Sequence, residues 1–176
     1  MIRRIRRLLL YLFSLFVLFL LQISLPVFMP FTALKPNLLL ILVSSFGLLR
    51  GERTGLLLGF LSGLLIDLLF GDVVGLYALI YMFLGFIVGT FYKSFATNRI
   101  LLSVSLIGAA DVFYGFVCYV FLFLLRGRFH FGYYLWHVIL PEAVFTMTIA
   151  VLLYPLFLKI NDLLEERELM RTRRFV

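Results

Sequence analysis

Charged residues, cysteine and histidine are scarce in this sequence. Asp, Glu, Lys and Arg make up 14% of the 176 residues and hydrophobic residues 64%, with one cysteine and two histidines. A soluble domain has about 25% charged and about 45–50% apolar residues, so this chain cannot surround its core with a polar shell. Disordered chains are too poor in apolar residues, and disulfide frameworks too rich in cysteine, to match it. The composition predicts an integral membrane protein.

Six apolar segments are long enough, or nearly long enough, to cross a bilayer, which takes about 20 helical residues. We interpret all six as helices, because backbone exposed to lipid must satisfy its own hydrogen bonds. The predicted fold is an all-α bundle forming one transmembrane domain, 1–176, with helices at about 8–25, 36–50, 54–70, 74–92, 100–125 and 134–158. The second segment is short, so a re-entrant hairpin with the third is an alternative. The charged turn 50–53 between them favours two full crossings.

The basic residues predict the orientation of the bundle. With a cytoplasmic N-terminus, Lys35, Arg126 and Arg128 lie on the outer side and the other 13 basic residues on the cytoplasmic side. This asymmetry follows the positive-inside rule, so we expect both termini in the cytoplasm, with 160–176 forming a charged tail that continues the last helix. The arginine-rich start is typical of a signal peptide, but no small-residue cleavage site follows, and we expect the first helix to be retained.

No motif in the sequence indicates catalysis or nucleic-acid binding. The net charge of +7 is explained by topology, and the N-terminal arginines are expected to bind anionic lipid head groups. The sequence contains no HExxH, GxSxG or P-loop motif, and both histidines, His130 and His137, lie in the last outer loop. We therefore expect no enzymatic activity, no cofactor, no metal and no nucleic-acid partner.

Glycines recur at every fourth position in the third predicted helix. Gly55, Gly59 and Gly63 lie along one face of it, and Gly85 and Gly89 share the same spacing in the fourth. Small residues at this spacing let two transmembrane backbones approach closely. The pattern predicts tight packing of the third helix against the fourth.

Three acidic residues fall within the predicted helices. Asp67 continues the glycine face of the third helix, Asp111 lies near the middle of the fifth, and Glu142 lies about two turns into the sixth. A charge at the bilayer centre is costly, and such residues usually face the interior of a bundle. The alternatives are hydrogen bonding to polar groups such as Asn37, a ligand or proton site, and a contact with a helix of another protein.

The last outer loop, 126–137, is rich in aromatic and basic residues. An aromatic belt at the membrane interface explains most of this composition, and a surface for an extracytoplasmic partner is the alternative, because Tyr, Trp and Arg are favoured at interfaces. The residues proposed for that surface are Arg126, Arg128, Phe129, Phe131, Tyr133, Tyr134 and Trp136.

Three stretches of the sequence resemble the rod shape-determining protein MreD family. They are PNLLLILVSSFGLLRG at 36–51, GLLLGFLSGLLIDLLFG at 55–71 and GLYAL at 75–79. The chain length, the six apolar segments and the arginine-rich start agree with the family. Many members have a polar residue immediately before the aspartate of the third helix, where this chain has Ile66.

The resemblance implies a multi-pass protein of the bacterial cytoplasmic membrane that supports cell shape and lateral peptidoglycan synthesis. The partners that it implies are MreC, a bitopic protein, and through it the MreB filament, a SEDS glycosyltransferase and a class B penicillin-binding protein. It also implies a fold similar to the substrate-binding subunits of energy-coupling-factor transporters. Two hypotheses follow, namely a scaffold that holds partner helices and a transporter-like subunit that binds a small molecule or lipid.

Overall fold

Helices account for all regular secondary structure in the part of the chain that the computed structural model describes. That part is 2–28, 35–71, 75–93, 100–122 and 131–173, with side chains described for 7–25, 35–71, 75–92, 100–121 and 131–163. The elements are α1 (Ile2–Phe28), α2 (Leu38–Arg50), α3 (Glu52–Phe70), α4 (Leu76–Thr90), a 3₁₀ turn (Phe91–Lys93), α5 (Ile100–Leu122), α6 (Phe131–Tyr134), a π-helical turn (Leu135–Ile139) and α7 (Leu140–Arg173). The predicted all-α fold is confirmed.

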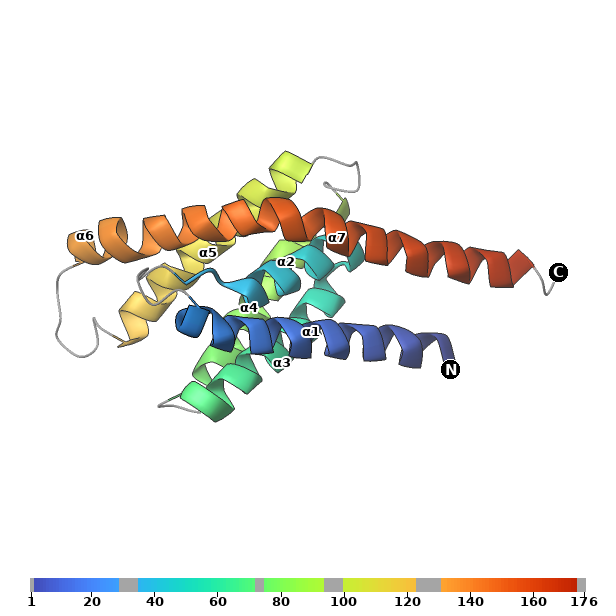
Figure 1. Ribbon diagram of the computed structural model, residues 1–176, viewed down its shortest axis with the longest axis horizontal. Coiled ribbons are helices and arrows are strands. Elements are labelled where there is room, and N and C mark those ends of the chain that lie inside the picture. The colour runs from blue at the N-terminus through green and yellow to red at the C-terminus, as the bar shows by residue number, and fades with distance from the viewer. Residues whose placement is uncertain (1, 29–34, 72–74, 94–99, 123–130, 174–176) are drawn as a thin grey trace.

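The first and last helices are longer than the segments 8–25 and 134–158 expected from hydropathy. Helix α1 begins within the arginine-rich start and continues through Pro26, and α7 follows α6 and the π turn without a break and extends into the charged tail. Arg, Lys and Glu are good helix formers, so helical structure does not end where hydropathy does. The start of α1 and the end of α7 lie at the same end of the molecule (Figure 1).

Four of the helical segments are long and apolar enough to cross a membrane. They lie in α1, α3, α5 and the continuous α6–α7 helix. Helices α2 and α4 have 13 and 15 residues, which at about 1.5 Å per residue gives lengths of about 20 Å and about 22 Å. The hydrocarbon core is about 30 Å thick. Of the six helices expected to span the membrane, four are therefore long enough among the described residues, and α2 and α4 are too short.

The short helix α2 forms the centre of the bundle. Every residue from Leu38 to Leu48 is buried, and α2 contacts α1, α3, α4, α5 and α7. The Phe46 ring packs between Tyr11 of α1 and Phe157 of α7. Apolar residues surround α2 on all sides, so its sequence is almost uniformly hydrophobic and shows no amphipathic period.

Helices α3 and α4 are in backbone contact along the glycine face. A methyl group added at Gly55 would overlap the backbone of Gly85, and one added at Gly59 would overlap the backbone of Tyr81. A Cβ at Gly89 would lie 2.7 Å from the backbone nitrogen of Glu52. The absence of side chains at these positions is therefore what allows the two helices to lie so close together.

We predict that Gly59→Ala destabilises the protein. The new methyl group meets rigid backbone, and overpacking of this kind costs about 1–3 kcal/mol. The matched control is Gly132→Ala in α6, where an added Cβ meets no atom within 4 Å. Thermal unfolding in detergent measures both variants, and an equal melting temperature for them would contradict close packing at Gly59.

Candidate functional site

Asn37 joins four helices through a buried polar cluster. Its side-chain Oδ1 accepts a hydrogen bond from the Tyr81 hydroxyl of α4 at 2.6 Å, and its Nδ2 donates to Asp111 Oδ1 of α5 at 3.3 Å. Its backbone N–H donates to the Thr146 hydroxyl of α7 at 3.1 Å. All four residues are buried. We call Asn37, Tyr81, Asp111 and Thr146 the polar cluster.

The polar cluster lies where α2 begins, inside the protein. The first N–H groups of a helix have no partner within the helix, and here they belong to the buried residues Leu38, Leu39 and Leu40. Asn37 Oδ1 accepts from the N–H of Leu40 at 3.1 Å, and Gln22 Oε1 of α1 accepts from the N–H of Leu39 at 3.0 Å. The N–H of Leu38 donates to the carbonyl of Pro36. Side-chain oxygens therefore supply the hydrogen-bond acceptors that the first turn of α2 lacks inside the bundle.

Asp111 and Glu142 are the acids of this region. One oxygen of Asp111 is bound to Asn37, and the Thr146 hydroxyl lies next to the same carboxyl group. The second oxygen, Oδ2, is buried without a hydrogen bond of good geometry to the described residues. Glu142 is partly buried and close enough to Asp111 and Lys35 to interact with both electrostatically. The polar cluster therefore contains one acid, Asp111, and has a second, Glu142, close to it.

Asp67 is not part of the polar cluster, and its hydrogen-bond partners lie on the neighbouring helix α4. Asp67 as a whole is 2% exposed, and its carboxylate accepts hydrogen bonds from the backbone N–H groups of Tyr77 at 3.0 Å and Ala78 at 2.8 Å. These are two of the first N–H groups of α4, so Asp67 of α3 caps the neighbouring helix. Negative charge at a helix N-terminus is also favourable for the helix dipole.

The structure brings together only some of the polar residues singled out in the sequence. Asn37 and Asp111 are bonded, and Glu142 lies near Asp111. Asp67 is occupied by α4 and takes no part in the polar cluster. Tyr81, Thr146 and Gln22 belong to the site although nothing in their spacing marked them.

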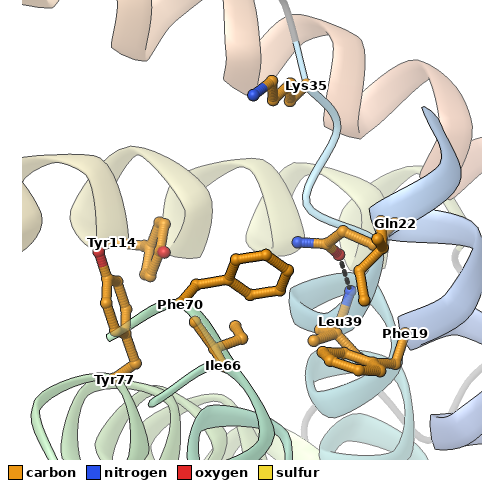
Figure 2. Close-up of a pocket in the computed structure, with 9 residues that line it drawn as sticks. Phe19, Gln22, Lys35, Leu39, Ile66, Phe70, Tyr77 and Tyr114 are labelled. Atoms are coloured by element: carbon orange, nitrogen blue, oxygen red, sulfur yellow. Dashed lines mark hydrogen bonds between the residues drawn. The ribbon is translucent and has the colours of Figure 1, made fainter. Parts of the chain in front are cut away.

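A cavity of about 250 Å³ lies beside the beginning of α2 (Figure 2). We call it the Lys35 cavity, because Lys35 is the one cation among the described residues that line it. Its walls come from α1, the segment before α2, and helices α2 to α5. The lining residues are Phe19, Gln22, Ile23, Lys35, Leu39, Ile66, Phe70, Tyr77 and Tyr114.

The aromatic segment 126–137 is described only from residue 131 onward, and Arg126, Arg128 and Phe129 lie outside the described residues. The Phe131 ring packs against Phe116 and Tyr119 of α5, and Tyr134 also packs against Tyr119. These contacts hold α6 on the bundle.

Two other aromatic residues of this segment remain on the surface. Tyr133 and Trp136 are 67% and 69% exposed, and the Tyr133 ring stacks on His137 with their centroids 4.2 Å apart. We call Tyr133, Trp136 and His137 the aromatic ridge.

A π-helical turn carries part of the aromatic ridge. The N–H of Leu140 bonds to the carbonyl of Leu135, five residues back. The next residue, Pro141, has no N–H to continue the ordinary pattern, and π turns of this kind are frequent at functional sites. An open groove begins beside the turn and is lined by Trp136, Leu140, Pro141, Val144, Phe145 and Thr148. Pro141 was the sequence signal that could have indicated it.

Comparisons with known proteins identify a family. The family model for the rod shape-determining protein MreD matches residues 2–163. No curated protein and no solved structure matches the chain, so the similarity to energy-coupling-factor subunits stays a prediction.

We predict that Asn37→Leu destabilises the protein by about 2 kcal/mol, because it removes a helix cap and leaves Tyr81 and Asp111 without their shared partner. The control is Ser44→Ala, a buried truncation on α2 whose hydroxyl makes no hydrogen bond to the described residues. Chemical or thermal unfolding in detergent compares the two. If Ser44→Ala proves as harmful as Asn37→Leu, the polar cluster is not a stabilising hub.

Proposed function

The chain belongs to the rod shape-determining protein MreD family, and on that premise we propose that it is a non-enzymatic scaffold that binds an MreC-type bitopic membrane protein. The family match over residues 2–163 is the observation that carries the proposal. It implies a role in rod shape determination. Four apolar helices of membrane-spanning length agree with a multi-pass membrane protein.

The arrangement of buried polar groups supports a scaffold. Asp67 and Asn37 use their side-chain oxygens to complete the beginnings of α4 and α2. Both groups hold short helices in place inside the bundle. A rigid bundle of this kind presents fixed outer faces, which a scaffold needs for binding other membrane proteins.

We assign the MreC-type partner to the aromatic ridge and the adjoining groove on α7. Tyr and Trp are enriched among residues that dominate binding energy, and Tyr133 and Trp136 are largely exposed beside an apolar groove. A single membrane-spanning helix can lie along the groove residues Val144 and Thr148. The ridge itself would then meet the part of the partner that leaves the membrane.

The wider assembly follows from the family. Through the MreC-type protein the chain would connect indirectly to the MreB filament and to a SEDS glycosyltransferase with a class B penicillin-binding protein, in the cytoplasmic membrane of a bacterium. In this assembly both termini face the cytoplasm, where the basic start of α1 binds anionic lipids. The observed placement of the two chain ends at one end of the molecule agrees with this orientation (Figure 1).

A second candidate function is a transporter-like subunit that binds a small molecule or lipid. The observation in its favour is the Lys35 cavity together with the acids Asp111 and Glu142 nearby. A site that binds a cation or moves a proton needs an ionisable group at Asp111, whereas a structural hydrogen bond to Asn37 does not.

We predict that Asp111→Asn keeps shape-supporting activity, because an amide oxygen at this position can still accept from Asn37 Nδ2. The measurement is rod-shape complementation in a strain that lacks the native protein, with membrane levels checked by immunoblot. Loss of complementation at normal membrane levels would favour the cation or proton site over the scaffold.

We predict that Trp136→Ala weakens co-purification with the host's MreC-type protein in nanodiscs by about tenfold or more, since a dominant interface residue contributes about 2 kcal/mol. The control is Phe83→Ala, which removes an exposed aromatic side chain from α4. Equal retention of the partner by both variants would place the interface elsewhere on the bundle.

A further inference from the structure

Lys35 and Gln22 give the Lys35 cavity a positive charge and a hydrogen-bond donor. Gln22 Oε1 accepts from the N–H of Leu39 at 3.0 Å, so the amide nitrogen of Gln22 is directed into the cavity (Figure 2). Lys35 supplies an ammonium group to the same lining, and the side chains of Tyr77 and Tyr114 form part of its wall. This set of groups matches the oxygens of a phosphate.

The described acidic residues near the cavity do not line it, so they do not oppose the binding of an anion there. No carboxylate is among the described lining residues. Asp67 is bound to the N–H groups that begin α4, and Glu142 interacts electrostatically with Lys35 from α7 without lining the cavity. An anion in the cavity would therefore meet a cation and the amide donor of Gln22, with no acid among the described lining residues.

The cavity opens onto a surface of exposed apolar side chains. Phe70 and Ile23 line it, yet they are 61% and 38% exposed, and Leu69 beside Phe70 is exposed as well. In a multi-pass membrane protein such a surface faces acyl chains rather than water. A ligand that enters here needs an apolar part as well as an anionic one, which a free phosphate ion lacks.

We propose that the Lys35 cavity binds the head group of one anionic phospholipid. Its phosphate lies between Lys35 and the amide nitrogen of Gln22, and its acyl chains lie along the exposed apolar flank of α1 and α3. A volume of about 250 Å³ is of the size of a glycerophosphate head group. The site is independent of the partner assigned to the aromatic ridge.

The first test removes the cation. Native mass spectrometry of the full chain released from nanodiscs of equal phosphatidylglycerol and phosphatidylcholine should show one retained phosphatidylglycerol in preference to phosphatidylcholine. Lys35→Gln should reduce this retention about tenfold, the size expected for one charge-assisted contact. The control Lys159→Gln removes an exposed positive charge near the far end of the bundle and should retain the lipid.

The second test fills the cavity without changing charge. Ile66→Trp places a large ring in the lining and should abolish the preference for phosphatidylglycerol, whereas Leu57→Trp, on an exposed position of α3, should preserve it. Lys35 is exposed, so its variant tests the proposal even where Ile66→Trp disturbs folding.

Three results would overturn the proposal. Equal retention by Lys35→Gln and Lys159→Gln would mean that the cation has no part in binding. Equal retention of the two lipids by the wild-type chain would mean that the anionic charge is not recognised. If inorganic phosphate alone raised the melting temperature as much as phosphatidylglycerol does, the site would take a soluble anion and not a lipid.

Discussion

The need to satisfy the first N–H groups of a helix inside an apolar bundle governs the centre of this protein. Helix α2 is too short to reach from one membrane surface to the other, and its first residues are buried in the bundle. Asn37 and Gln22 supply the oxygens that its first turn lacks. Because Asn37 also holds Tyr81 and Asp111, the same residue fixes α4 and α5 around α2. The other helices pack on this capped central helix.

Helix α4 solves the same problem with a partner from another helix. The glycines of α3 bring its backbone against that of α4, and Gly63 lies next to Tyr77 and Ala78. Asp67 is one turn further along the same face, so its carboxylate reaches the N–H groups of those two residues. Close packing and capping therefore depend on each other, and the short helix α4 needs both.

Two regions of the surface are suited to different ligands. The aromatic ridge presents rigid rings on a turn that Pro141 widens, next to an apolar groove, which suits a protein helix. The Lys35 cavity presents donors and a cation behind exposed apolar side chains, which suits a lipid. Both regions belong to a protein of the rod shape-determining MreD family.

The sequence by itself determined the all-helical class and the glycine face of α3, because composition and a spacing of four are local properties of the chain. The stretches 36–51, 55–71 and 75–79 carried the resemblance to the MreD family. The sequence did not determine that Asn37 meets Asp111 and Thr146, which are 74 and 109 residues away, or that Asp67 caps α4. Hydropathy also could not show that α2 is wholly enclosed by protein. Only the tertiary structure decided these, because a buried polar group takes whichever partner the packing of distant helices places within hydrogen-bond distance.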